Sequence, residues 1–202
     1  MNYQDADLVI KALNRWNMRA FSRLSVLKFD ELNVMRTVSA TYKESAALAK
    51  RKYKELYLLA YKAAAKHLKQ KKLRPPDDIM NDWLLDMLED YDAVTHYRFN
   101  EETERKKART AEALIATHID GREADKALRY WVLQLAQYAD RSVDDGTLQA
   151  YRDAGVKRVR WISEKDNKVC DECEDLDGRI FNIDELPDKP HFRCRCRYEP
   201  VI

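Results

Sequence analysis

The sequence has few of the residues that interrupt regular secondary structure: its 202 residues include four glycines and five prolines. Before residue 146 these are only Pro75, Pro76 and Gly121, and the remaining six lie after residue 145. All four cysteines also lie in that last stretch. Because Gly and Pro mark turns and loops, the two parts differ in structure. We therefore expect a helical region over residues 1–150 and a small module over residues 151–202.

Long hydrophobic runs and an excess of one charge sign are also missing. The longest apolar run, Leu56–Tyr61, has six residues, whereas a membrane-spanning helix needs about 18 or more. Residues 1–10 do not combine a basic segment with an apolar one, so we expect neither a secretory signal nor a membrane partner. With 37 basic and 35 acidic residues, the net charge of +2 by itself predicts no nucleic-acid partner.

Motifs for catalysis are missing as well. The sequence has no Gly-rich phosphate loop and no His-Glu-x-x-His pair. His67, His96 and His118 have no nucleophile motif beside them, which favours surface or packing roles over general-base catalysis. We expect that the protein is not an enzyme.

Hydrophobic residues in the first region recur with the period of helices, at steps of three or four residues. The predicted helices cover residues 13–27, 42–68, 83–91, 111–119 and 123–139. Pro75 and Pro76 disfavour helical geometry at the residues that precede them, so we expect the second helix to end there. In total, four to six helices are expected in this region.

The helical region separates charges of opposite sign. Residues 43–74 hold eleven Lys or Arg against two Glu, whereas residues 77–92 hold seven acids and no base. One interpretation is structural: a helical hairpin turns at Pro75 and Pro76, and the acidic helix lies against or near the basic one. The other is that the basic helix neutralises the phosphates of a nucleic acid. The candidate contact residues on it are Lys50, Arg51, Lys54, Lys62 and Lys66.

The cysteines and one histidine have a spacing typical of a zinc site. Cys170 and Cys173 are separated by two residues, and seventeen residues later the chain offers His191, Cys194 and Cys196. Zinc prefers four thiolate or imidazole ligands in a tetrahedron, and a two-residue gap lets both cysteines reach one ion. We therefore predict one structural Zn²⁺ held by four of these five residues. The spacing does not choose which four.

Two disulfides, a redox-active cysteine pair and plain packing are the alternatives to zinc. Disulfides persist mainly in oxidising compartments, and no export signal is visible. A redox pair needs its motif at a helix start within a βαβ unit, which the neighbouring residues do not suggest. In zinc-finger peptides a structural ion contributes on the order of 10 kcal/mol, enough to fold a segment too small to bury a core alone.

Around this motif the pattern changes to short strands and turns. Residues 158–161 and 180–181 are predicted as strands, with a turn at Asp177–Gly178 before the second. If residues 193–198 form a third strand, its cysteines share one face and its arginines share the other. The candidate partner-contact residues on that second face are Arg193, Arg195 and Arg197. The fold class we expect is mainly α, with the helical region followed by a small α+β module pinned by zinc.

Residues 155–202 also contain a specific order of residues: Gly155, Trp161, Asp166, Val169-Cys170-x-x-Cys173, Leu176-Asp177-Gly178 and Pro190-His191-x-x-Cys194-Arg195-Cys196. This order resembles the C-terminal signature of the phage Mu F-like head morphogenesis proteins, also called minor head or minor capsid proteins. The helical region fits that family only in being helical. Some relatives carry toxin or transferase domains beyond this signature, and we expect none here.

The resemblance implies a component of the tailed-phage head that is encoded beside the portal protein and incorporated during assembly. It also implies an oligomeric assembly and contacts with portal protein, scaffold or other head proteins, and packaged DNA. We therefore expect a structural minor head protein at or near the portal, located in the virion head and, during assembly, in the host cytoplasm. The alternative is a zinc-stabilised nucleic-acid-binding protein.

Overall fold

The computed structural model describes residues 4–70, 72–90, 97–166, 169–191 and 194–202. These residues form six helices and one three-stranded sheet, which confirms the prediction of a mainly α chain with a small α+β module. They divide into two compact units. The bundle unit consists of residues 7–52 and 81–136, and the sheet unit of residues 4–6, 53–80 and 137–202. The division at residue 150, made on composition, stays a prediction.

Five of the helices make up most of the chain. They are α1 (Gln4–Ser25), α2 (Glu31–His67), α3 (Asp77–Glu89), α4 (Phe99–Ala116) and α5 (Gly121–Asp153). The predicted helices at 111–119 and 123–139 are segments of the longer α4 and α5. Residues 100–109 of α4 are rich in Glu, Lys and Arg, which favour helix without adding to an apolar stripe. Periodicity alone therefore underestimated these helices.

The second helix ends before the prolines. α2 stops at His67, within one residue of the predicted range 42–68, so the prediction that Pro75 and Pro76 end this helix is wrong. Lys69 has a φ of +60°, and the N–H of Gln70 donates to the Ala65 carbonyl at 2.8 Å. A left-handed residue followed by this backward hydrogen bond is a Schellman ending, which satisfies the last carbonyls of a helix.

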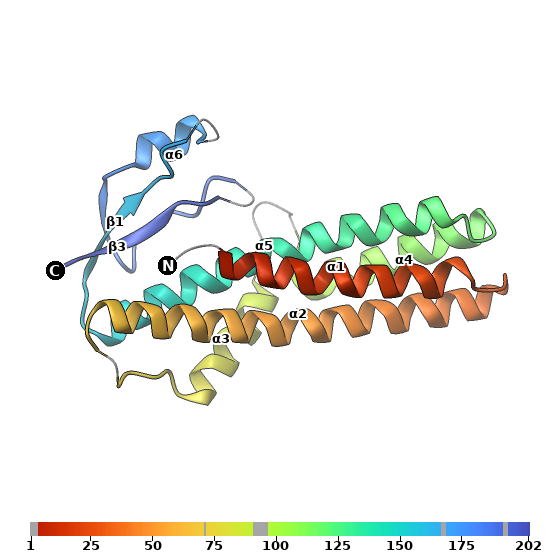
Figure 1. Ribbon diagram of the computed structural model, residues 1–202, viewed down its shortest axis with the longest axis horizontal. Helices are drawn as coiled ribbons and strands as arrows, with labels where there is room; N and C mark the ends of the chain where they lie inside the picture. The colour runs from red at the N-terminus through yellow and green to blue at the C-terminus, as the bar shows by residue number, and fades with distance from the viewer. Residues whose placement is uncertain (1–3, 71, 91–96, 167–168, 192–193) are drawn as a thin grey trace. The chain divides into compact units, whose positions relative to one another are not determined.

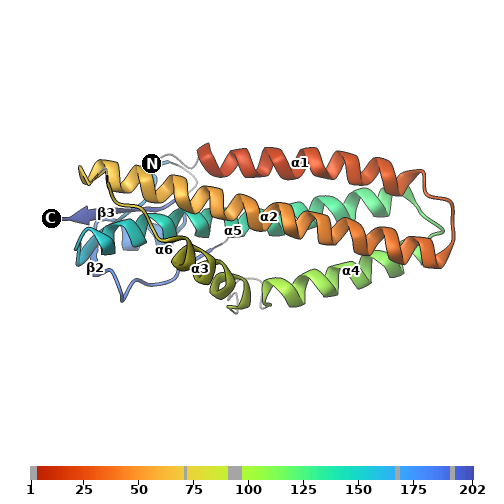
Figure 2. The same ribbon diagram turned by 90° about the horizontal axis from the view of Figure 1, so that it is seen from below.

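In the bundle unit α1, α2, α4 and α5 run side by side (Figures 1 and 2). α1 buries one stripe of residues: Val9, Leu13, Trp16, Ala20 and Leu24. Some buried polar groups in this unit are paired across helices: the Tyr42 hydroxyl and Thr110 Oγ1 are 2.7 Å apart, and Trp131 Nε1 donates to Ser45 Oγ at 2.8 Å. The interior is therefore apolar, with paired polar groups crossing between helices.

The sheet unit contains three antiparallel strands in the order β2-β1-β3. Their bounds are β1 (Arg158–Ile162), β2 (Ile180–Asn182) and β3 (Arg197–Val201), and the short helix α6 (Asp171–Leu176) lies between β1 and β2 in the chain. The first two strands confirm the prediction. The third begins at Arg197 instead of Arg193, although Cys194 and Cys196 are still buried and Arg195 is exposed, as the expected alternation requires.

The core of the sheet unit joins the strands to residues of α2 and α5. Val159 and Trp161 of β1 are fully buried, and Tyr61 and Tyr151 belong to the same cluster. A Cβ added at Gly146 would lie 2.3 Å from the Tyr57 carbonyl oxygen, so α5 passes α2 here at a distance that only glycine permits. The module predicted to be too small for a core of its own therefore shares a core with two long helices.

Candidate metal centre

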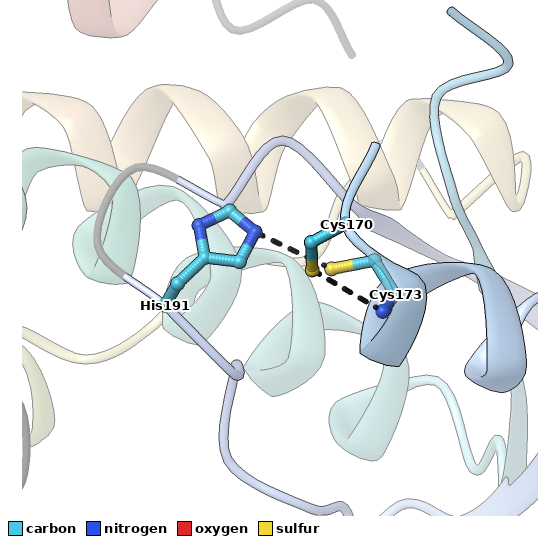
Figure 3. Close-up of side chains that lie close together, drawn as sticks. All are labelled: Cys170, Cys173 and His191. Atoms are coloured by element: carbon cyan, nitrogen blue, oxygen red, sulfur yellow. Dashed lines mark hydrogen bonds between the residues drawn. The ribbon is translucent and has the colours of Figure 1, made fainter. Parts of the chain in front are cut away.

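The first two cysteines are placed by the start of α6. Cys170 has extended backbone angles and caps the helix, and its sulfur accepts a hydrogen bond from the N–H of Cys173 at 3.4 Å. Because the two residues are three apart across a helix start, both sulfurs lie at the same end of α6 (Figure 3). Cys173 is 2% exposed and Cys170 is half-buried.

The other candidate ligands lie on the segment that leads into β3. His191 Nε2 lies 3.5 Å from the Cys173 sulfur (Figure 3), and the Cys194 sulfur is also 3.5 Å from it. Two groups have donor atoms that all lie within 4.8 Å of one another: Cys170, Cys173 and His191, and Cys173, Cys194 and Cys196. All five sequence-predicted residues are therefore brought together, and Cys173 is common to both groups.

The spacing of these atoms fits a tetrahedral ion better than a disulfide. Two sulfurs bound to one Zn²⁺ at about 2.3 Å are separated by about 3.8 Å, close to the 3.5 Å between Cys173 and Cys194. A disulfide needs about 2.0 Å, and all four cysteines are free thiols in this structure. The clusters could thus hold a metal ion; its identity stays a prediction.

The electrostatics of the cluster also favour a bound cation. Burial raises the pKa of the Cys173 thiol well above its ordinary value, and hydrogen bonds with the neighbouring sulfurs raise it further. Burial also raises the pKa of Cys194 to about 11. Buried thiols resist ionisation mainly because the charged thiolate loses its hydration, and a second thiolate nearby adds repulsion. A bound cation reverses this preference, since a coordinating thiol is deprotonated.

One ion pair beside the cluster was missed by the sequence analysis. Lys189 Nζ lies 2.5 Å from Asp144 Oδ2 of α5 and donates to the Cys194 carbonyl at 3.4 Å. Burial raises the pKa of Asp144 to about 6, and the positive charge of Lys189 opposes that rise. These residues lie far apart in the chain and belong to no motif, so no sequence signal pairs them.

The arginines near the site are paired with acids of the same module. Arg195 makes two hydrogen bonds to Asp166, at 2.7 and 2.8 Å. Arg197 lies 3.3 Å from Glu164 and 3.6 Å from Glu199. Arg193 lies outside the described residues, as does His96.

The predicted contact residues of α2 differ in exposure. Arg51, Lys62 and Lys66 are exposed, whereas Lys50 and Lys54 are half-buried. Lys50 Nζ lies 5.7 Å from the centre of the Phe99 ring, which gives it a packing role in the bundle unit. Whether any of these residues contacts nucleic acid stays a prediction.

The fold and the site together define a helical protein that carries a Cys/His module able to hold a metal ion. Residues 132–199 of this chain match the family described as Phage Mu protein F like protein. The match confirms the resemblance of this part of the chain to the phage Mu F-like proteins. The matched range begins within α5. The signature recognised in the sequence begins further along the chain, at Gly155.

Two other comparisons add no relatives: no curated protein and no solved structure matches the chain. None of the helices in the described part of the chain is long and apolar enough to span a membrane.

Proposed function

We propose that this protein is a structural minor head protein of a tailed phage or prophage that acts in head assembly at or near the portal. The observation that carries the proposal is the family match over residues 132–199, which covers β1, β2, the first three residues of β3 and the candidate metal centre. Its proposed partners are the portal protein, scaffold or other head proteins, in an oligomeric assembly. Its proposed location is the virion head and, during assembly, the host cytoplasm.

The proposed centre is a single structural Zn²⁺ site. Cys170 and Cys173 would hold the ion from the start of α6, and two of His191, Cys194 and Cys196 would hold it from the segment before β3. When bound, the ion supplies a crosslink between two parts of the module that are separated in the chain. Because four protein donors close a tetrahedral site to water, we propose a role in holding shape and none in catalysis.

Metal analysis of the purified chain tests the centre. We expect one Zn²⁺ per chain in the wild type and loss of that metal in Cys173→Ser, since Cys173 belongs to both donor groups. Asp175→Ser is the matched control, because Asp175 is an exposed residue of the same helix and offers no sulfur. Equal zinc in the wild type and Cys173→Ser would contradict the ligand assignment.

Head assembly is tested on particles. Mass spectrometry of purified heads should detect this chain, and crosslinking should connect it to the portal protein. Inactivation of its gene should lower the yield of DNA-filled heads. A chain that is absent from purified heads would overturn the proposed function.

A nucleic-acid-binding function is the second candidate, favoured by the exposed Arg51, Lys62 and Lys66 of α2. The pairing of Arg195 and Arg197 with acids weakens it, because a phosphate would have to displace carboxylates. If several phosphates are neutralised, DNA affinity should fall steeply with salt and fall further in Lys62→Glu/Lys66→Glu than in the control Lys126→Glu. Lack of binding at about 50 mM salt would remove this candidate.

A further inference from the structure

Lys189 is a nearly buried cation that contacts α5, β3 and the backbone of Cys194. Its ammonium lies 2.5 Å from Asp144 Oδ2 of α5, donates to the Cys194 carbonyl at 3.4 Å and lies 5.7 Å from the centre of the Tyr198 ring of β3. The side chains of Lys189 and Asp144 are 16% and 12% exposed. A charge so far from water persists only with a partner of opposite charge, so the position of Lys189 depends on α5.

The contacts of Lys189 act on the segment that carries two candidate ligands. Residue 189 precedes His191 by two positions, and its side chain returns to the backbone of Cys194. The ammonium therefore bridges this segment and, through Asp144, attaches it to a helix. Groups that hold metal ligands in place in this way commonly set metal affinity, because an ion binds best to donors already held in its geometry.

We propose that Lys189 is a positioning residue of the metal centre, and that the Asp144–Lys189 pair presets the segment bearing His191 and Cys194 for metal binding. This inference rests on the proposed metal centre. Metal affinity then depends on Asp144 of α5 as well as on the ligand side chains. By thermodynamic reciprocity, metal binding strengthens the Asp144–Lys189 pair by the same factor by which the pair strengthens metal binding.

A second ion pair from the same helix provides the control. Arg152 Nε lies 2.9 Å from Asp184 Oδ1, with side-chain exposures of 39% and 77%, and Arg152 also donates to the Ile183 carbonyl at 3.1 Å. It joins α5 to the module as Lys189 does, but it reaches residues 183 and 184 and not the ligand segment. Arg152→Met therefore removes a helix-to-module link without touching the ligand backbone.

The test measures the Zn²⁺ affinity of the full chain by competition with a chromophoric chelator. It compares wild type, Lys189→Met, Lys189→Arg, Asp144→Asn and Arg152→Met. We expect Lys189→Met to weaken Zn²⁺ binding about 10- to 100-fold and Asp144→Asn to weaken it less, with Lys189→Arg recovering part of the loss. Arg152→Met should leave the affinity within about twofold of wild type, as expected for an exposed pair.

A spectroscopic readout separates positioning from general stabilisation. With Co²⁺ in place of Zn²⁺, the sulfur-to-metal absorption of Lys189→Met at saturating metal should report altered ligand geometry, while that of Arg152→Met should match wild type. If Lys189→Met does not fold, Asp144→Asn and Lys189→Arg carry the same comparison.

Three results would contradict these ideas in distinguishable ways. Equal Zn²⁺ affinity in wild type, Lys189→Met and Asp144→Asn would overturn the positioning role and leave the metal centre intact. An equal loss in Arg152→Met and Lys189→Met would also overturn it, because any helix-to-module link would then suffice. A wild-type chain that binds no Zn²⁺ would overturn the proposed metal centre, and this inference with it.

Discussion

The bundle unit packs apolar stripes of helices against one another, whereas the sheet unit buries three cysteines in its core beside Trp161 and Tyr198. In the bundle unit, polar groups such as the Tyr42 hydroxyl and Trp131 Nε1 are satisfied by other side chains. In the sheet unit, the raised pKa of the Cys173 thiol shows that its sulfur cluster favours protonation without a cation. The core of the bundle unit thus combines apolar side chains with polar pairs between helices, whereas the sheet unit has a core whose donor atoms suit a metal ion.

Removal of the ion should produce the largest difference in stability between the two units. With a strong chelator, or in Cys173→Ser, we expect the sheet unit to lose a stabilisation on the order of 10 kcal/mol, as in zinc-finger peptides. Hydrogen exchange should accelerate at the amides of β1 and β3, while those of α1 and α4 stay protected. Exchange that is unchanged in β1 and β3 would show that the sheet unit holds its shape without metal.

The two buried tryptophans allow a matched comparison. Trp131→Ala in the bundle unit and Trp161→Ala in the sheet unit, which are 1% and 0% exposed, should each cost about 3–5 kcal/mol because of the cavity left behind. Only Trp161→Ala should also weaken Zn²⁺ binding, since Trp161 shares a cluster with Cys173, Cys194 and Cys196. Chemical denaturation and metal competition measure the two effects. Equal metal affinity in both variants would break the proposed link between core and metal.

Two helical glycines differ in the space around them. Gly146→Ala places a Cβ 2.3 Å from the Tyr57 carbonyl oxygen, so α2 or α5 must shift at an expected cost of about 1–3 kcal/mol. At Gly121 the nearest atoms to an added Cβ, on Phe21, are 3.9 Å away, and Gly121→Ala should change stability by less than about 1 kcal/mol. Thermal unfolding at saturating metal measures both. Equal losses would mean that the close approach at Gly146 is unimportant.

Exposed ion pairs should matter least in either unit. Arg195 pairs with Asp166 in the sheet unit, and Arg129 pairs with Asp125 in the bundle unit at 2.7 Å. Each pair is solvent-exposed, so Arg195→Ala and Arg129→Ala should each change the free energy of unfolding by about 0.2–1 kcal/mol. A larger loss in Arg195→Ala, together with weaker metal binding, would show that this pair also supports the ligand segment.

The sequence predicted the parts of this protein whose spacing is local. Steps of three and four residues located the helices, and alternation located β1 with Val159 and Trp161 inward. The two-residue gap between Cys170 and Cys173 predicted that both sulfurs can reach one ion. The start of α6, which places the two sulfurs close together, was not predicted. The family signature could also be recognised from the sequence, because it consists of residues in a fixed order along the chain.

Contacts between distant residues could not be predicted in this way. The Asp144–Lys189 pair and the passage of Gly146 beside Tyr57 follow from how α2, α5 and the module pack, and no local pattern encodes either. α2 also ends at His67 through the left-handed Lys69, which carries none of the Gly or Pro signals that mark a helix end.

Residue types and local spacing were thus sufficient to identify five candidate metal ligands, a mainly helical chain and a phage Mu F-like module. Only the tertiary structure showed that Cys173 belongs to both groups of donors, and that residues of α2 and α5 complete the core of the module. The physical reason is that periodicity reports which face of an element is apolar, whereas the partner of that face is chosen by packing among all elements at once.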